Sequence, residues 1–384
     1  MLIKNGRILH YSRFEAGSDM RVENGKITAI GQRLAPEPGE QVVDAAGNYV
    51  LAGLIDLHHH GIRHVLAQTG SLLEYSRLLL EVGVTACVAA LSGTPEDNIE
   101  AMQRGLQETD RFRLAPNVIG YRPEISYIAK TGAGSANSLR PIADETTREV
   151  YEGAEGFIRI WDVSPELEGA VPFIRWASEQ GIVTSLAHSS ATVADTRRAI
   201  EAGMSLVTHF YDTFDVAVQT DPGVYPAGLT DWLQIEDRIT VEIVPDGVHV
   251  HPYLVEKTFR CKGIDRVALV TDASMGSGSP PGIYGGLCEG VEVEVTVDRG
   301  VRRASDDCLS GSALTHLQGF RNTVQRFGKS IVEASIMCSR TPARVLGETS
   351  KGYLAAGMDA DIIVLDSALD LQATIVGGEL LYSA

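Results

Sequence analysis

The chain has 384 residues, of which 44% are hydrophobic, and this is enough apolar surface for one large core and a smaller second one. Its formal net charge of −17 argues against binding to nucleic acid or to an anionic membrane surface, because both require a basic patch. No stretch reaches the roughly 18 apolar residues of a membrane span, and the first residues resemble a strand rather than a signal peptide, so we expect a cytoplasmic protein.

Residues 1–50 contain short strands of alternating polarity, separated by Asn-Gly and Gly-Asn turns. The segments "MLIKNGRILH", "DMRVENGKITAIG" and "EQVVDAAGNYV" show this pattern most clearly. It is typical of a β-meander.

Residues 51–348 alternate between β-branched or apolar runs and amphipathic helical segments. The eight runs are residues 51–60, 84–91, 117–124, 157–166, 182–190, 206–212, 240–249 and 266–273. Strands that alternate with helices indicate parallel βαβ units, and eight of them predict an α/β fold of the (β/α)8 (TIM) barrel type.

The eighth run is followed by a glycine-rich stretch, "GSGSPPGIYGG" (276–286), which we interpret as a loop at the rim of the barrel. Alternating residues near 288–305 then predict a hairpin insertion.

Residues 349–384 return to the pattern of the first 50, with "DADIIVLDS" and "ATIVGGELLYS" as predicted strands. We therefore expect residues 1–50 and 349–384 to fold together into a small β-sandwich beside the barrel.

Polar residues that bind metals or transfer protons end six of the eight barrel runs. In chain order they are His58 and His60, Glu124, His188, His209, His249, and Asp272. In a barrel of this type the carboxyl ends of the strands surround one mouth, where active sites are built.

A single histidine at a strand end is more often a structural residue than a ligand. Six strand ends that converge on one rim predict a shared site instead, because imidazoles and carboxylates there come within metal-bonding reach. Histidine, glutamate and aspartate without cysteine favour a divalent ion of the catalytic type, with zinc as the first candidate.

The triplet His58-His59-His60 separates into two parts, because side chains alternate across a strand. His58 and His60 share one face and can bind one ion together. His59 points to the opposite face, where we expect it to be hydrogen-bonded between the strand and a helix.

The motifs that carry this pattern resemble those of the amidohydrolase superfamily and, within it, of the N-acetylglucosamine-6-phosphate deacetylases. They are "DLHHHG", Glu124, "AHSSAT", "THFYDTF", "DGVHVHP", "LVTDA", "LSGSALT" and "TPARVLG…KGYLAAGMDADIIVLD", and they extend over nearly the whole chain.

The resemblance implies roles for these residues. Glu124, His188 and His209 match the ligands of one metal ion, and His58 and His60 match the pair that binds a second ion in binuclear members. Asp272 matches the catalytic aspartate and also lies among the metal ligands. His249 matches the histidine that contacts the substrate carbonyl.

Chemistry supports the same roles. A divalent ion makes hydroxide available near neutral pH. Asp272 can take the proton of the attacking water and return it to the amine, while the ion and His249 stabilise the oxyanion. The number of ions, one or two, is left open, and the pair His58 and His60 favours two.

Several substrate positions depart from the deacetylase pattern. Arg122 replaces a histidine beside the ligand glutamate, and Asp212 stands where the family has a substrate-binding asparagine. The stretch "DPGVYPAGLTDW", with Tyr225, lacks the arginine that reaches the sugar phosphate in the family. We interpret Asp212, His249, Arg122 and Tyr225 as contacts to an altered substrate that need not be phosphorylated.

The leading hypothesis is a metal-dependent hydrolase of amino-sugar metabolism that removes an acyl group, in the first place acetyl, from an N-acyl amino sugar. Within the superfamily the alternatives are another small amide, a cyclic amide, an N-acyl amino acid or an ester. From another class comes a barrel that serves as a non-catalytic scaffold. The expected partner is a small-molecule substrate, with no nucleic acid and no membrane, and the resemblance suggests a homodimer.

Overall fold

The barrel is built from short parallel strands in the computed structural model, which describes residues 1–384 except 125, 286–291 and 297. Its strands are β6 (Leu54–His59), β9 (Val84–Leu91), β10 (Val118–Pro123), β11 (Ile160–Val163), β12 (Val183–Leu186), β13 (Leu206–Val207), β14 (Thr240–Ile243) and β15 (Val267–Leu269). All eight residues of β9 are buried, as expected for a strand that is covered on both faces. The predicted (β/α)8 barrel is thereby confirmed.

Single parallel bridges close the barrel. Hydrogen bonds pair the strands in two parallel sheets, β6-β9-β10 and β11 to β15 in sequence order. A bridge between Tyr121 and Ile158 joins the sheets on one side, and a bridge between His59 and Ala273 joins them on the other. Every carboxyl strand end therefore faces the same mouth.

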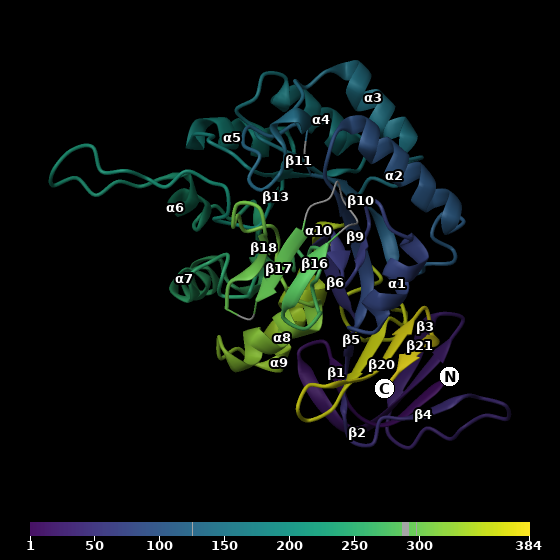
Figure 1. Cartoon of the computed structure of the whole chain (residues 1–384). Helices are drawn as coiled ribbons and strands as arrows, with labels where there is room; N and C mark the ends of the chain where they lie inside the picture. The colour runs from purple at the N-terminus through teal and green to yellow at the C-terminus, as the bar shows by residue number, and fades with distance from the viewer. Residues whose placement is uncertain (125, 286–291, 297) are drawn as a thin grey trace.

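Helices surround the barrel, as Figure 1 shows. The α-helices are α1 (Leu72–Leu80), α2 (Pro95–Glu108), α3 (Asp144–Gly153), α4 (Ala170–Glu179), α5 (Val193–Ala202), α6 (Leu229–Leu233), α7 (Pro252–Lys262), α8 (His316–Gln325), α9 (Ile331–Ser335) and α10 (Thr341–Val345). Short 3-10 turns, η1 (Ala136–Ser138) and η2 (Ile264–Arg266), and a π-helical turn, η3 (Ile336–Arg340), complete the set. Among the described residues, none of the helices combines the length and the apolar character that a membrane span needs.

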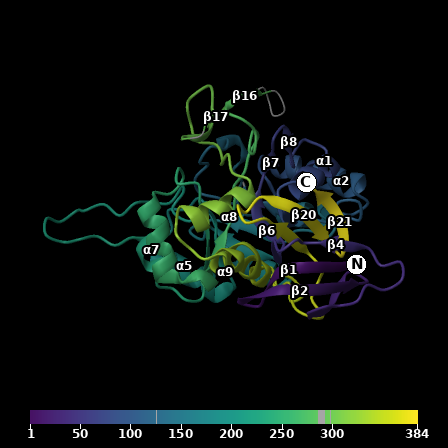
Figure 2. The same cartoon turned by 90° about the horizontal axis from the view of Figure 1, so that it is seen from below.

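Both ends of the chain enter one eight-stranded sheet beside the barrel. Its strands are β1 (Leu2–His10), β2 (Arg13–Glu23), β3 (Lys26–Gly31), β4 (Val42–Asp44), β5 (Tyr49–Ala52), β19 (Ile362–Leu365), β20 (Leu371–Val376) and β21 (Glu379–Ser383). The order is β21-β20-β19-β5-β1-β2-β3, with β4 paired to β1. Figures 1 and 2 show the purple and yellow strands side by side, as the sequence predicts for the two ends. This sheet has its own apolar core, in which Ile8, Val50 and Ile362 are fully buried.

The predicted run 51–60 is two strands rather than one, and Gly53 separates them. β5 pairs with β19 in the sheet, whereas β6 pairs with β9 in the barrel. The backbone N–H of Gly53 donates to the carbonyl of Asp361. A Cβ at Gly53 would lie 2.0 Å from Oγ1 of Thr85, so only glycine lets the two bodies approach this closely.

A small antiparallel sheet follows the barrel at the rim, from β16 (Gly282–Gly285), β17 (Glu292–Thr296) and β18 (Gly300–Arg303). The predicted rim loop 276–286 is wrong in part, because β16 pairs with β17. Its residues alternate in exposure, which the glycines obscure in the sequence. Of the predicted hairpin 288–305, residues 288–291 and 297 lie outside the described residues. A two-residue hairpin, β7 (Gly61–Ile62) and β8 (Val65–Leu66), lies after β6.

Replacing Gly53 by alanine tests the junction. We expect Gly53→Ala to lower the free energy of unfolding by about 1–3 kcal/mol, because the new methyl group overpacks against Thr85. Chemical denaturation measures it. Gly31→Ala is the matched control, since a Cβ there meets only Cδ2 of Leu34 at 3.9 Å. Equal stability of the two variants would contradict this account of the junction.

Candidate active site

The polar residues predicted at the strand ends do meet at the mouth of the barrel. They are His58, His60, Glu124, His188, His209, His249 and Asp272. The parallel register explains the meeting, because every strand delivers its last inward-facing side chain to the same rim.

Glu124, directly after β10, lies at the centre of the cluster. Its Oε1 is 3.2 Å from Nε2 of His188 and 3.3 Å from Nε2 of His209. Its Oε2 is 3.0 Å from Nε2 of His60. One carboxylate therefore touches histidines from both halves of the cluster.

Two pairs of imidazoles face each other through nitrogen atoms. Nε2 of His58 lies 3.1 Å from Nε2 of His60, and the same distance separates Nε2 of His188 and His209. Two nitrogens bound to one tetrahedral zinc ion at about 2.0–2.1 Å lie about 3.3 Å apart. The pairs thus have the spacing of ligands that share an ion.

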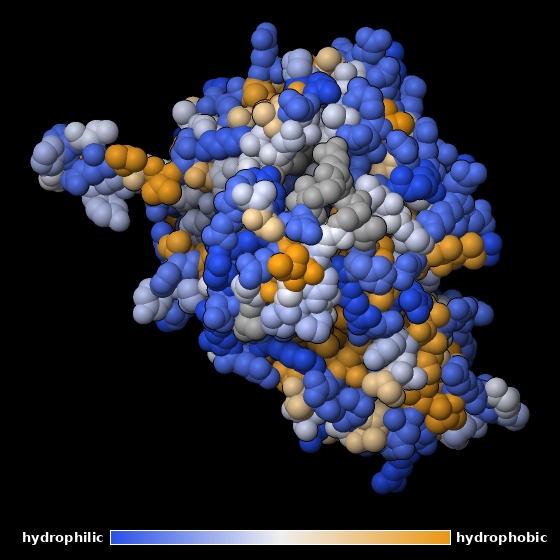
Figure 3. All heavy atoms as spheres, viewed as in Figure 1, coloured by the Kyte–Doolittle hydropathy of each residue, from blue (hydrophilic) through white to orange (hydrophobic). Residues whose placement is uncertain are grey.

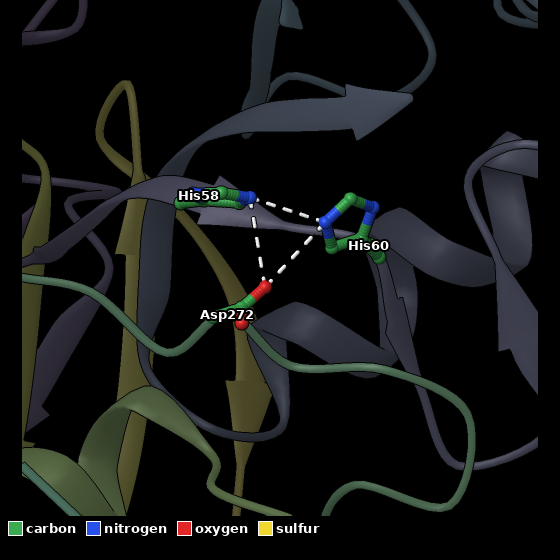
Figure 4. A group of neighbouring side chains, drawn as sticks. All are labelled: His58, His60 and Asp272. Carbon is green, nitrogen blue, oxygen red and sulfur yellow. Dashed lines mark hydrogen bonds and ion pairs between the residues drawn. The ribbon is translucent and has the colours of Figure 1, made fainter. Parts of the chain in front are cut away.

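Two groups of side chains have the geometry of a metal site. One is His58, His60 and Asp272, and the other is His58, Glu124 and His209. Figure 4 shows the first group, in which Oδ1 of Asp272 is 3.5 Å from Nε2 of each histidine. The donors are histidine and carboxylate only, so they fit a divalent ion of the catalytic type.

Three of these residues adopt left-handed backbone conformations. The φ angles are 47° at His188, 23° at His209 and 47° at Asp272. Such conformations cost non-glycine residues about 1–3 kcal/mol each and persist where the surrounding structure imposes them, often at functional sites. Here they turn each side chain into the mouth just as its strand ends.

Hydrogen bonds from the chain orient individual histidines. Nδ1 of His188 donates to the carbonyl of Lys130 at 3.0 Å, which leaves a lone pair on Nε2 toward the site. Nδ1 of His59 pairs with the hydroxyl of Tyr75 on α1 at 2.8 Å. His59 thus bonds between strand and helix, as predicted, and holds the backbone between His58 and His60.

The charges in the cluster reinforce one another. Burial lowers the pKa of His60, but the carboxylates of Glu124 and Asp272 outweigh it and raise this pKa to about 9. Burial raises the pKa of Asp272, and the neighbouring histidines, above all His58, lower it well below its usual range. Both carboxyl groups therefore stay ionised and able to bind a cation.

His249, in the loop after β14, presents one nitrogen to the mouth. Its Nδ1 is 2.6 Å from Oδ2 of Asp246, whose Oδ1 accepts the backbone N–H of Val248 and of His249. Nε2 is buried, has no hydrogen-bond partner among the described residues, and lies 3.8 Å from Oδ2 of Asp272. Asp246 fixes this ring, and the sequence analysis did not identify it.

Arg122 is not a substrate contact, contrary to the prediction. Its side chain is fully buried beneath the cluster, where Nε is 2.8 Å from Oδ2 of Asp162 and Nη1 is 2.7 Å from Oε1 of Glu242. Oε2 of Glu242 lies 3.7 Å from Nδ1 of His58 and accepts the backbone N–H of His209. Arg122 thus supports the ligands from below.

Asp162 and Glu242 were also missed, although the sequence carries a signal for both. Each is the lone charge in a short buried strand, in "IWDV" and "TVEI". A charged side chain in a fully buried strand needs a partner of opposite charge, and Arg122 is that partner.

Tyr225 does not lie at the mouth of its own barrel, and its contact with substrate stays a prediction. It is 95% exposed on a long loop between β13 and α6, residues 214–228, which we name the arm. Figures 1 and 2 show the arm projecting from the barrel, and Figure 3 shows hydrophobic side chains along its stem. Its apolar side chains Val216, Val218 and Val224 are exposed rather than packed against the body.

Asp212 lies in the turn between β13 and the arm. Its backbone N–H donates to the carbonyl of His209 at 3.0 Å, and its side chain is partly exposed. Of the four predicted substrate contacts, the structure thus places Asp212 and His249 beside the cluster.

Comparisons with known proteins agree over the whole chain. A family model described as "Amidohydrolase family" matches residues 49–381. The N-acetylglucosamine-6-phosphate deacetylase of Vibrio furnissii is 31% identical over 98% of this chain and 94% of its own, and the N-acetylgalactosamine-6-phosphate deacetylase of Escherichia coli O157:H7 is 30% identical over 94% of each. The solved N-acetyl-D-glucosamine-6-phosphate deacetylase of Mycobacterium smegmatis matches with a TM-score of 0.87 and 27% identity, covering 100% of this chain and 99% of that one.

Metal removal tests the cluster. We expect the purified protein to hold a divalent ion and chelation to lower its melting temperature, because an ion bound only by the folded state stabilises that state. Glu124→Gln should lose at least about tenfold in metal affinity, since this carboxylate touches both imidazole pairs. Metal analysis and thermal melts measure both effects. The exposed Glu96→Gln is the control, and wild-type metal content in Glu124→Gln would contradict the assignment.

Removal of the buried guanidinium tests the support beneath the cluster. We expect Arg122→Met to lower the free energy of unfolding by about 3–5 kcal/mol, because two buried carboxylates lose their counter-charge. Urea unfolding measures the free energy of unfolding of this variant and of the control Arg140→Met, which removes a partly exposed arginine. A loss no larger than that of Arg140→Met would show that the buried network does not hold the fold.

Proposed function

This chain belongs to the amidohydrolase family, and from that premise we propose that it removes an acyl group, in the first place acetyl, from the nitrogen of an amino sugar. The observation that carries the proposal is the meeting of four histidines, Glu124 and Asp272 at one barrel mouth, with His249 beside them. The substrate class rests on the deacetylases that this chain resembles over nearly its full length.

We propose that these residues hold one or two divalent ions, zinc in the first place. His58, His60 and Asp272 would form one ligand group. Glu124 and His209, which also lie within reach of His58, would form the other with His188, whose Nε2 lies 3.2 Å from Oε1 of Glu124. A bound ion supplies Lewis acidity that activates water and polarises an acyl carbonyl at neutral pH. Glu124 contacts histidines of both groups, so its carboxylate could serve as a ligand in either.

Asp272 is the proposed general base and acid. Its Oδ1 faces His58 and His60, which leaves Oδ2 toward His249 and the open mouth. Oδ2 would accept the proton of a water whose oxygen forms a bond to the acyl carbon. The same proton then passes to the amide nitrogen as the carbon–nitrogen bond breaks, and a neutral amine leaves.

His249 is the proposed partner of the acyl oxygen. Its ring is fixed by Asp246, and its free Nε2 faces the mouth beside Asp272. A nitrogen held in place before the reaction costs no reorganisation when the oxyanion develops. Asp246 is thus a positioning residue for His249.

Other properties expected from the resemblance are also proposals. A homodimer would cover the valines that the arm exposes, among them Val216 at 84% and Val218 at 74%. A cytoplasmic location and a place in amino-sugar metabolism follow from the activities of the named relatives.

Substitution of the proposed base tests the mechanism. With metal-loaded protein and N-acetylated amino sugars, we expect Asp272→Asn to lower kcat by at least about 10²–10⁴-fold, because an amide cannot accept the proton. Release of free amine measures turnover, and metal analysis in parallel separates lost proton transfer from a lost ion. Asp298→Asn, at an exposed turn, is the control.

A screen of amide and ester substrates with metal-loaded protein decides between amino-sugar deacylation and the alternative activities. Cyclic amides and N-acyl amino acids belong in it, and a preference for either would redirect the proposal within the family. Absence of hydrolysis by metal-loaded protein for every amide and ester would favour the scaffold instead.

A further inference from the structure

The turn after β13 is strained and carries Asp212 beside the cluster. Non-glycine residues with positive φ alternate through it, with 23° at His209, 84° at Tyr211 and 59° at Thr213. Strain of this kind persists only where the surrounding structure imposes it. In this turn it places Asp212 next to the metal-ligand candidate His209, whose carbonyl accepts the Asp212 N–H.

The Asp212 carboxylate has no counter-charge. Within the part of the chain that the structure describes, its oxygens make no hydrogen bond and no ion pair. Its negative charge nevertheless helps to raise the pKa of both His209 and His249. The other acidic residue of this turn, Asp215, is paired with Lys130 at 2.5 Å. Asp212 therefore offers an acceptor that no side chain of the described chain uses.

Two cations of the segments around the cluster, Lys130 and Arg303, already have partners. Lys130, whose carbonyl accepts Nδ1 of His188, binds Asp215 through its ammonium group. Arg303 on β18 donates to the carbonyl of Ala133 and binds both carboxylate oxygens of Asp306. Residues 211–231, which include the arm, contain four aspartates and no lysine, arginine or histidine. A phosphate here would meet negative charge, and the two cations would have to give up existing partners to bind it.

A second polar group beside the cluster, Nε2 of His249, also lacks a hydrogen-bond partner among the described residues. This nitrogen is buried, and Oδ2 of Asp272 lies 3.8 Å from it. Asp212 and His249 thus leave one carboxylate and one ring nitrogen beside the cluster without a hydrogen-bond partner among the described residues. Buried polar atoms of this kind are normally satisfied, so a polar ligand is the simplest completion.

We propose that the site selects an uncharged N-acyl amino sugar, without phosphate or carboxylate, and that Asp212 determines this choice by accepting hydrogen bonds from the sugar hydroxyls. The inference rests on the proposed deacylation and names its substrate class. A carboxylate only accepts hydrogen bonds, so hydroxyl groups complement it. An anionic group in the same place would be repelled by the Asp212 carboxylate, which weakens binding when no cation offsets the repulsion.

The test compares N-acetylglucosamine with its 6-phosphate on full-length, metal-loaded protein at fixed ionic strength. We expect kcat/KM for the uncharged sugar to exceed that for the phosphate by at least about tenfold. Asp212→Asn should narrow this ratio at least about fivefold, by raising kcat/KM for the phosphate, because it removes the repulsion and keeps the shape. Thermal melts should stay unchanged, because the Asp212 carboxylate has no partner within the described chain.

Asp221→Asn is the matched control, since it removes the same charge from an exposed position on the arm. It should leave the ratio at the wild-type value. A wild-type preference for the phosphate, or an Asp212→Asn ratio equal to that of wild type, would overturn the inference while amide hydrolysis itself stands. No hydrolysis of any amide would overturn the proposed function as well, so the two failures are distinguishable.

Discussion

The buried guanidinium of Arg122 is the interaction on which the arrangement of the mouth depends. It reaches from β10 to Asp162 on β11 and Glu242 on β14, and it also donates to the carbonyl of Leu57 on β6. Because the barrel closes through single bridges, these charged contacts across its interior tie together strands that backbone pairing alone joins weakly. Glu242 in turn contacts the ring of His58 and accepts the backbone N–H of His209, so the buried network also holds these two residues in place.

Polarity changes in layers along the barrel axis. Beneath the mouth the charges of Arg122, Asp162 and Glu242 satisfy one another within the chain. One layer higher, imidazole nitrogens and carboxylate oxygens converge with spacings that suit a shared cation. At the rim, the carboxylate of Asp212 and Nε2 of His249 form no hydrogen bond with the described residues. The charges deep in the barrel are thus paired within the chain. The two polar groups nearer the solvent, where an ion and a substrate would enter, lack such partners within the described chain.

Much of this architecture can be predicted from sequence, because it follows local rules. Strand and helix periodicity predicts the barrel, and period-two alternation separates His59 from His58 and His60. What the sequence does not predict has a common cause, since it concerns which side chains meet across the fold. The position of Arg122 near Glu124 suggests a substrate contact, but a step of two residues along the strand separates the rim from the interior. Tyr225 lies on a loop whose direction no local pattern specifies. The roles of Asp246 and Glu242 depend on contacts with side chains that the fold brings near them, and the periodicity of a sequence does not predict such contacts.

The eight-stranded sheet has a consequence for how the molecule is made. β5 pairs with β19, which follows the entire barrel in the sequence. During synthesis on the ribosome, β1 to β5 must therefore wait with an unpaired edge while the barrel is produced, and such edges favour aggregation. The strand that closes this edge also supplies the partner of the Gly53 N–H, through Asp361 just before it. The junction that aligns the first barrel strand is thus completed last, so a nascent chain acquires a finished metal-ligand strand only when translation is nearly over.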